Sequence, residues 1–180
     1  GLARSVSKHL TQEGTIMGTL GYLAPDTEIT LEVNPGTVNK ATLAAYRAAG
    51  INRINIGLQS MDDRTLTFLG RIHTAKTGVD TFRWARETGF DNIGLDLIYG
   101  IPGQSLLSWR YDLERALEYE PEHLSCYQLT YEPETPLYRR CEKGKVRPLD
   151  ENLCGDLFEA TGEFLNSRGY QQYEVSNFAR

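Results

Sequence analysis

The chain has 180 residues, of which 40% are hydrophobic and 24% are charged, and its formal net charge is −5. This composition is typical of a globular domain with a sizeable core, and the acidic balance argues against binding nucleic acid or an anionic membrane through bulk charge. No apolar run approaches the roughly 20 residues that span a bilayer. The cysteines, Cys126, Cys141 and Cys154, are odd in number and widely spaced, so we expect no disulfide framework and a cytoplasmic location.

Strand-like and helix-like segments alternate along the chain. In chain order, the pattern predicts a strand at Ile29–Asn34, a helix at Asn39–Ala49, a strand at Arg53–Gln59, helices at Asp62–Leu69 and Lys76–Thr88, a strand at Asn92–Tyr99, a helix at Ser105–Glu120, a strand at His123–Tyr131, a helix at Asp150–Ser167 and a strand at Gln171–Phe178. The first 24 residues are also predicted to be helical. We find no linker or low-complexity segment, so residues 1–180 are expected to lie within one domain.

This alternation predicts an α/β fold with a parallel sheet and right-handed crossovers. Each of the first three strands has one apolar face and one face that is mostly polar residues or glycine. The second face comprises Thr30, Glu32 and Asn34, then Asn55, Gly57 and Gln59, and then Gly94, Asp96 and Ile98. Strands covered by helices on both sides are almost continuously apolar, and closed barrels fill their interiors with bulky branched residues. The pattern therefore favours an open or partial barrel with a polar interior that holds a ligand.

Three side chains on the predicted polar face are candidates for binding that ligand. Glu32 and Asp96 are carboxylates within apolar strands, where a charge is costly unless it is paired or bound to a ligand. The alternative for each is pairing with an internal arginine or a backbone donor. Together with Gln59 they favour a binding site, because carboxylate and amide acceptors suit ribose hydroxyls and an amino group.

Two further features each allow two interpretations. Arg71 follows a predicted helix, and pattern alone favours a solvated cation that interacts with the helix dipole. The turn at Gly100–Gly103 either brings the backbone close to a ligand or simply connects a strand to a helix.

The sequence contains no motif typical of a metal site or a catalytic nucleophile. His9, His73 and His123 are scattered, and there is no His-Glu-x-x-His, no Cys-x-x-Cys, no glycine-rich phosphate loop and no Gly-x-Ser-x-Gly. We therefore predict neither a metal ligand nor a nucleophile within these 180 residues.

Several segments resemble, in the same order, those of a known family. They are LEVNPGT at Leu31–Thr37, INRINIGLQSMDD at Ile51–Asp63, LGRIH at Leu69–His73, GLDLIYGIPGQ at Gly94–Gln104, PEHLSCYQLTYEPETPL at Pro121–Leu137 and YEVSNFAR at Tyr173–Arg180. The set resembles the oxygen-independent coproporphyrinogen III oxidase family of radical S-adenosylmethionine (SAM) proteins. The last two segments favour its HemW branch, whose members are regarded as heme chaperones.

The resemblance implies a partial, open (β/α) barrel with parallel strands and outer helices. It also implies that Glu32, Gln59, Arg71 and Asp96 belong to a SAM site, with Thr130 as a further position in the cofactor wall. In this assignment Glu32 holds the methionyl end of SAM, Gln59 and Asp96 hold the ribose hydroxyls, and Arg71 holds a carboxylate or hydroxyl. The implied cofactors are SAM, a [4Fe-4S] cluster and heme.

The chain departs from the family pattern at both ends. The Cys-x-x-x-Cys-x-x-Cys that ligates the cluster and the glycine-rich SAM loop after it would precede Gly1, and a His-Asn and Tyr-Trp motif would follow Arg180. We therefore expect the central part of a partial barrel, incomplete at both ends, with the cluster ligands outside this chain. Such a piece would be inactive, and an unpaired edge at Ile29–Asn34 would promote its aggregation.

The resemblance leaves two main functions for the parent protein. A heme chaperone, which the motifs favour, would bind the cluster, SAM and heme and deliver heme to an acceptor protein. An oxygen-independent oxidase would decarboxylate two propionates of coproporphyrinogen III, while the protein orients the substrate and excludes water. An unrelated (β/α) barrel enzyme is the third alternative.

The expected partners follow from these functions. They are heme or a porphyrinogen and a heme-acceptor protein, with no nucleic acid and with a membrane reached only through the acceptor. Nothing in the sequence identifies a heme ligand, for which His73 and His123 are only candidates.

Overall fold

The predicted strands up to residue 131 are confirmed in the computed structural model, which describes residues 27–180. They are β1 (Thr30–Val33), β2 (Arg53–Gln59), β3 (Asn92–Tyr99) and β4 (His123–Gln128). β4 ends three residues earlier than expected, so Thr130 lies in the segment after the strand. The helix expected within the first 24 residues lies outside the described residues.

Side chains that cap the first turn fix where the helices begin. The helices are α1 (Lys40–Ala48), α2 (Asp63–Phe68), α3 (Ala75–Glu87), α4 (Leu106–Leu117), α5 (Pro136–Glu142) and α6 (Glu151–Ser167). Each follows a Ser, Thr, Asn or Asp whose side chain accepts a hydrogen bond from a backbone N–H of the first turn. The sequence pattern did not predict α5. Among the described residues, no helix is both long enough and apolar enough to cross a membrane.

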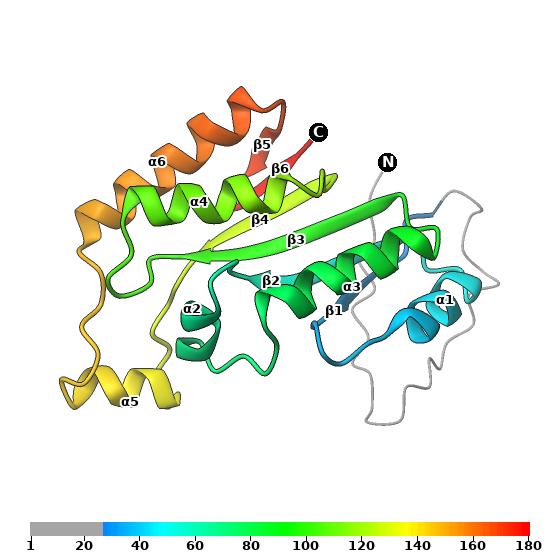
Figure 1. The fold of residues 1–180 in the computed structure, drawn as a ribbon. Coiled ribbons are helices and arrows are strands. Elements are labelled where there is room, and N and C mark those ends of the chain that lie inside the picture. Colours follow the sequence, from blue (N-terminus) through cyan, green and yellow to red (C-terminus); the bar gives the residue numbers. More distant parts are fainter. Residues whose placement is uncertain (1–26) are drawn as a thin grey trace.

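The strands form one sheet with the order β1-β2-β3-β4-β6-β5 (Figure 1). β1 to β4 are parallel, as expected. The prediction of one last strand at Gln171–Phe178 was wrong, because that segment is a hairpin of β5 (Gln171–Glu174) and β6 (Asn177–Ala179). β6 pairs antiparallel with β4, so the sheet is mixed and open, and the fold is an α/β fold. The Glu174 carboxylate accepts hydrogen bonds from the Ser176 N–H and the Asn177 amide, which stabilise the turn.

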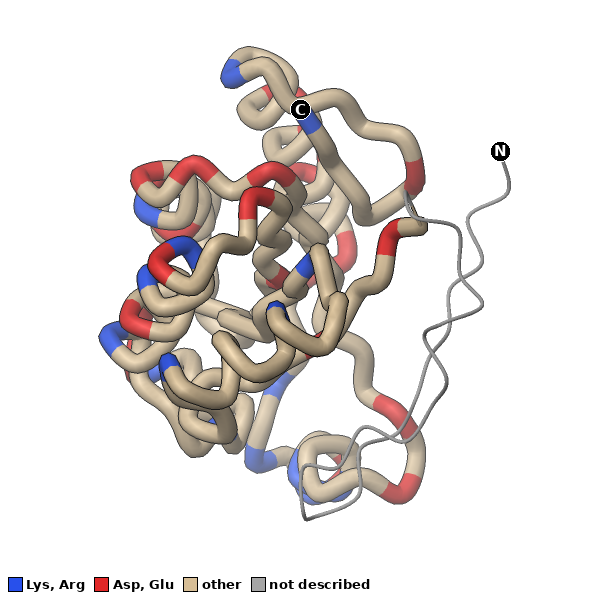
Figure 2. Tube along the Cα trace, turned by 90° about the vertical axis from the view of Figure 1, so that its right-hand side faces the viewer, with Lys and Arg blue, Asp and Glu red and all other residues tan. Residues whose placement is uncertain are grey.

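The helices α1, α3, α4 and α6 cover one face of this sheet (Figure 1). After a quarter turn they lie to the left of the strands, with Lys and Arg interspersed with Asp and Glu along them (Figure 2). The apolar strand residues Ile54, Ile56, Leu58, Leu95 and Leu97 lie buried in the core between the sheet and these helices. α3 approaches β2 so closely that a Cβ on Gly78 would collide with Leu58. The apolar half of the predicted alternation therefore forms the core.

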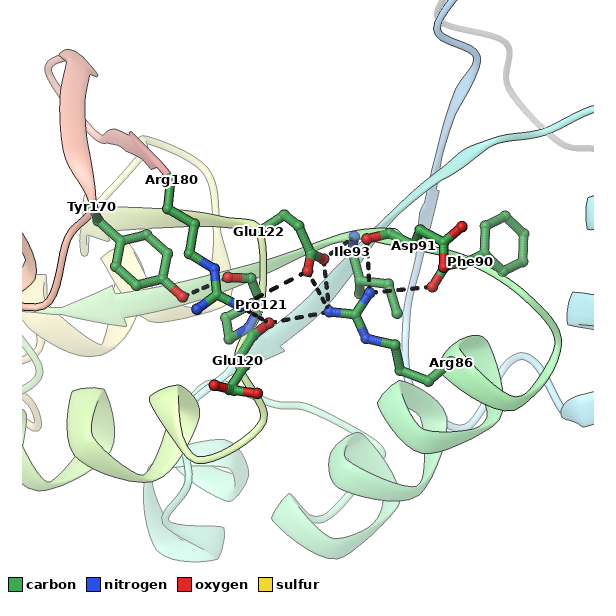
Figure 3. A network of polar contacts seen from close by, with 9 residues as sticks. All are labelled: Arg86, Phe90, Asp91, Ile93, Glu120, Pro121, Glu122, Tyr170 and Arg180. Carbon is green, nitrogen blue, oxygen red and sulfur yellow. Dashed lines mark hydrogen bonds and ion pairs between the residues drawn. The ribbon is translucent and has the colours of Figure 1, made fainter.

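A polar network joins the amino ends of β3 and β4 (Figure 3). Arg86, in the last turn of α3, binds both carboxylate oxygens of Glu122 at 2.7 Å. The same guanidinium donates to the backbone carbonyls of Phe90, Asp91 and Glu120. Glu122 also accepts from the Ile93 N–H at 2.9 Å, and Arg180 donates to the Glu120 carbonyl at 2.8 Å. These residues stabilise the amino edge of the sheet, opposite the edge at which ligands of parallel sheets bind.

Candidate cofactor-binding site

The polar face of the sheet is organised by strand register. In one row Glu32 lies beside Asn55, which lies beside Gly94, which in turn lies beside His123. One step toward the carboxyl ends, Asp96 of β3 lies beside Ser125 of β4. None of the described helices α1, α3, α4 and α6 covers this face (Figures 1 and 2). The polar alternation of the sequence thus becomes a continuous polar surface.

Asp96 and Asn55 form the centre of this surface. The Asn55 amide donates to one Asp96 carboxylate oxygen at 2.8 Å, reaching across Gly94, where a Cβ would collide with the Asn55 oxygen. Burial raises the pKa of the Asp96 carboxyl, and the Glu32 charge raises it further. The hydrogen bond from Asn55, the nearby Ser125 hydroxyl and the charge of Arg53 act in the opposite direction. Glu32 lies beside Asn55 on the neighbouring strand and acts on Asp96 through its charge.

A second group of polar side chains gathers above Gly57. The Asn34 oxygen and the Gln59 amide would each lie 2.9 Å from a Cβ placed on that glycine. Arg71 is half-buried and donates to the same Asn34 oxygen at 3.2 Å. Its guanidinium is therefore joined to the polar face, in contrast to the solvated cation that pattern alone favoured.

Gln59 ends β2 in a backbone conformation that side chains rarely adopt. Its φ is +70°, and the register between β2 and β3 shifts between Ile56 and Gln59. Next to it, Ser60 donates to the buried carboxylate of Asp112 at 2.8 Å, and the Met61 N–H donates to the same carboxylate at 2.9 Å. α4 thus fixes the strained end of β2, and with it the buried Gln59 side chain.

The five predicted site residues do not all come together. Glu32 and Asp96 interact, and Gln59 and Arg71 both lie against the Asn34 side chain. Thr130 lies beyond the end of β4, and within residues 27–180 no side-chain hydrogen bond joins it to the other four. The prediction that Thr130 lies on the strand was wrong, because β4 ends at Gln128 although the apolar pattern of the sequence continues to Tyr131.

Asn55 and Asn34 were not among the predicted site residues, and His123 was named only as a candidate heme ligand. Asn55 and Asn34 stood on the predicted polar face, but only the strand register shows that Asn55 reaches Asp96. His123 is buried on the same face, and one of its ring nitrogens lies 2.7 Å from the Tyr173 hydroxyl. Burial and the charge of Arg53 lower the pKa of His123 to about 4.

The unpaired atoms of this face match a ligand that donates hydrogen bonds. Among the described residues, the second oxygen of Asp96 and the side-chain oxygen of Asn55 are buried without a donor, and the Glu32 carboxylate is exposed. Hydroxyl and amino groups would satisfy such acceptors. In contrast, residues 27–180 contain no group of three His, Cys, Asp or Glu side chains placed to hold a metal ion. The site fits a polar organic cofactor, and it supplies no ligands for a metal cluster.

Comparison with known proteins gives a family match over this part of the chain. The model of the radical SAM superfamily matches residues 5–116, a range that contains Glu32, Gln59, Arg71 and Asp96. A Mus musculus protein named radical S-adenosyl methionine domain-containing protein 1, mitochondrial, is 41% identical over 88% of this chain and 36% of that protein. The heme chaperone HemW of Escherichia coli is 44% identical over 88% of this chain and 41% of that protein. The chain thus spans about two fifths of the length of these curated relatives.

Solved structures share the fold. The coproporphyrinogen III oxidase HemN of Escherichia coli, described as a radical SAM enzyme, superposes with a TM-score of 0.74 at 29% identity. The match covers 86% of this chain and 36% of that one. The Elp3 protein of Methanocaldococcus infernus has a TM-score of 0.65 at 18% identity, over 75% of this chain and 32% of that one, which shows a common fold alone.

Proposed function

The chain belongs to the radical SAM superfamily, and from this membership we propose that its polar sheet face binds SAM and that the intact protein is a heme chaperone. The observation that supports the SAM site is the Asn55–Asp96 pair, whose buried free acceptors lie on the same polar sheet face as Glu32. The heme-chaperone part rests on the relatives of Escherichia coli and Bacillus subtilis, which are named heme chaperone HemW.

Each residue would hold a different part of SAM. Asp96 and Gln59 would accept hydrogen bonds from the ribose hydroxyls, and Glu32 would bind the amino group of the methionyl end. Arg71 would bind a carboxylate or hydroxyl, in the orientation set by its contact with Asn34. Thr130 stays a more distant candidate for the cofactor wall.

Membership of the superfamily implies SAM together with a [4Fe-4S] cluster, which supplies one-electron chemistry when bound. The cluster ligands would lie outside the described residues, since Cys126, Cys141 and Cys154 are free and do not gather. The residues of this chain would bind and orient the cofactor on the polar face of the sheet.

The SAM site is tested by removing its carboxylates in the full-length protein, reconstituted with iron and sulfide under anaerobic conditions. Asp96→Ala and Glu32→Ala should each weaken SAM binding by about 1–3 kcal/mol, because each removes a charge-assisted hydrogen bond. Isothermal titration calorimetry gives the affinities. Glu114→Ala is the matched control, since that carboxylate is exposed on α4 and pairs with Arg110. Unchanged affinity in both site variants would refute the assignment.

The alternative function is oxygen-independent coproporphyrinogen III oxidation, because HemN shares the fold. The reconstituted full-length protein should be incubated with SAM, a reductant and coproporphyrinogen III, with hemin titrated in parallel. A heme chaperone should bind hemin stoichiometrically, pass it to an acceptor protein and form no protoporphyrinogen IX. Formation of protoporphyrinogen IX would make the protein an oxidase and overturn the chaperone proposal.

A cytoplasmic location is also part of the proposal, and the three free cysteines support a reducing compartment. Cell fractionation tests it, since the relative in Mus musculus is named mitochondrial.

A further inference from the structure

A groove at the carboxyl edge of the sheet is not used by the proposed SAM site. It has a volume of about 820 Å³ and is lined from three connections. Phe68 follows β2, Pro102 and Gly103 follow β3, and Arg140 with residues 145–151 follows β4. In Figure 1 these segments meet at the lower left, where α5 lies below α2 and the chain turns back to α6. Connections after the carboxyl ends of parallel strands are the usual place for a ligand, and the volume lies within the usual range for ligand sites.

The groove carries a concentration of positive charge in an acidic chain. Five of the 19 Lys and Arg residues fall within residues 139–147, where the one acidic residue is Glu142. Three of them, Arg140, Lys145 and Arg147, line the groove. Among the described residues, none of the five forms an ion pair, although six other ion pairs are present. The cations of the groove are therefore available to an anionic ligand.

The acidic side chains that line the groove do not cancel this charge. Asp150 and Glu151 are its two carboxylates. Asp150 caps α6 and accepts hydrogen bonds from the N–H groups of Asn152 and Leu153, so its carboxylate interacts with the helix terminus. The groove therefore has three cations, and Glu151 is its one carboxylate that does not cap a helix.

Apolar side chains complete the lining. Phe68, Pro102, Val146 and Leu149 contribute to the wall, and the Arg140 guanidinium lies over the Phe68 ring at 5.2 Å from its centroid. A wall of this kind suits a ligand with a flat apolar body and carboxylates at its edge, because the apolar groups bury the body and the cations bind the carboxylates.

We propose that this groove binds the propionate carboxylates of a porphyrin, with Lys145 and Arg147 as the cations that hold them. The inference rests on the proposed heme function, and it gives the porphyrin a subsite separate from the polar sheet face. Arg140 keeps α5 against α2 through its contact with Phe68, and it contributes the third positive charge.

The test removes two cations and leaves the Arg140–Phe68 contact intact. The double variant Lys145→Gln and Arg147→Gln is made in the full-length protein, and binding of hemin and of metal-free coproporphyrin III is followed by absorbance titration. Both affinities should fall by about 10- to 100-fold, because charge-assisted hydrogen bonds are lost. Hemin dimethyl ester, which lacks the free carboxylates, should bind weakly to the wild type and equally to the variant.

The matched control is Arg139→Gln with Lys143→Gln. It removes the same charge from the same segment, but neither side chain lines the groove. Wild-type affinity for hemin should be retained in this control, and far-ultraviolet circular dichroism of both double variants checks that α5 and the fold are kept.

The outcomes separate this inference from the proposed function. If hemin binds equally to wild type and to the Lys145/Arg147 variant, the subsite is wrong and the heme proposal stands. If hemin does not bind but coproporphyrin III binds through Lys145 and Arg147, the subsite stands and the heme proposal fails. Binding of neither porphyrin, or equal losses in the test and control variants, overturns the subsite.

Discussion

Asp96 and His123 lie on the same sheet face, and burial acts on them in opposite directions. It raises the pKa of the Asp96 carboxyl and lowers the pKa of the His123 ring to about 4. In both cases the neutral form is favoured, because the ionised form loses its hydration. The Glu32 charge raises the pKa of Asp96, and the Arg53 charge lowers the pKa of both groups.

His123 should make the fold sensitive to acid. Since its pKa is lower in the folded state than the ordinary 6.5, its contribution to stability is present above pH 6.5 and is lost as the pH falls toward about 4. Urea denaturation of the intact protein between pH 7 and 4 measures this loss. His123→Gln, which stays neutral and can still bond to Tyr173, should lose less stability over the same interval. Parallel profiles of wild type and variant would contradict the prediction.

Gly94 should be required for the Asn55–Asp96 pair. A methyl group at Gly94 would occupy the space of the Asn55 side chain and displace it from Asp96. We expect Gly94→Ala to weaken SAM binding about tenfold, through the loss of one oriented hydrogen bond to a charged group. Calorimetry measures this in the full-length protein. Gly155→Ala is the control, because it adds the same methyl group on α6 with no atom within 4 Å, and equal affinities of the two variants would disprove the role of Gly94.

At the scale of elements, α3 is joined to the starts of β3 and β4 by Arg86. Its side chain is 29% exposed and binds the Glu122 carboxylate and three backbone carbonyls. Arg86→Ala should lower the free energy of unfolding by about 2–4 kcal/mol, because the half-buried Glu122 carboxylate loses its paired guanidinium and the carbonyls of Phe90 and Asp91 lose its hydrogen bonds. Urea denaturation of the intact protein measures the change.

The control for Arg86 is an arginine in an exposed ion pair. Arg110 pairs with Glu114 one turn away on α4, and both side chains are largely exposed. Arg110→Ala should cost only about 0.3–0.5 kcal/mol. A loss for Arg86→Ala as small as this would mean that the network in Figure 3 contributes little to stability.

The elements that the sequence predicted are those with a buried face. Apolar and polar residues alternate at a regular period in β1 to β4 and in the helices α1 to α4 and α6. The period distinguishes a helix from a strand, and the apolar positions show which side of the element faces the core. α5 has no buried residue, so it produced no periodic signal. The hairpin of β5 and β6 was missed because its turn contains no glycine or proline and depends on the Glu174 side chain.

The part of the candidate site that follows from alternating apolar and polar residues within one strand could be predicted from the sequence. Alternation placed Glu32, Gln59 and Asp96 on one face, and the register of Glu32 with Asn55 and of Asn55 with Gly94 follows it. Gln59 comes after a register shift, and its amide reaches this face above Gly57. The pairing of Asn55 with Asp96 depends on the register between two strands, which one sequence does not specify. The prediction that Thr130 lies on β4 was wrong for a different reason. The length of a strand is set by its pairing with neighbouring strands and not by the apolar pattern alone.

At the scale of the whole molecule, the layers are asymmetric. The long helices pack on one face of the sheet (Figure 1). β2 is buried along nearly its entire length, and β5 is exposed throughout. Stability should therefore decrease from β2 and β3 in the centre toward the hairpin and α5.

Hydrogen exchange of the intact protein should follow this gradient. Backbone amides of β2 and β3 should exchange slowest, because their hydrogen bonds lie between buried side chains, and those of α5 and β5 should exchange fastest. Mass spectrometry of peptides from each element gives the rates. Protection of β5 equal to that of β3 would show that the hairpin is part of the stable centre.

The unpaired acceptors of Asn55 and Asp96 make folding and binding thermodynamically linked. Each buried oxygen without a donor destabilises the ligand-free fold, and a bound molecule that donates to it removes that penalty. At a ligand concentration about 100 times the Kd, mass action alone adds about 2.7 kcal/mol of stability. The melting temperature of this protein is therefore a function of cofactor supply. A variant that unfolds in cofactor-poor cells should regain its folded population when the cofactor is abundant.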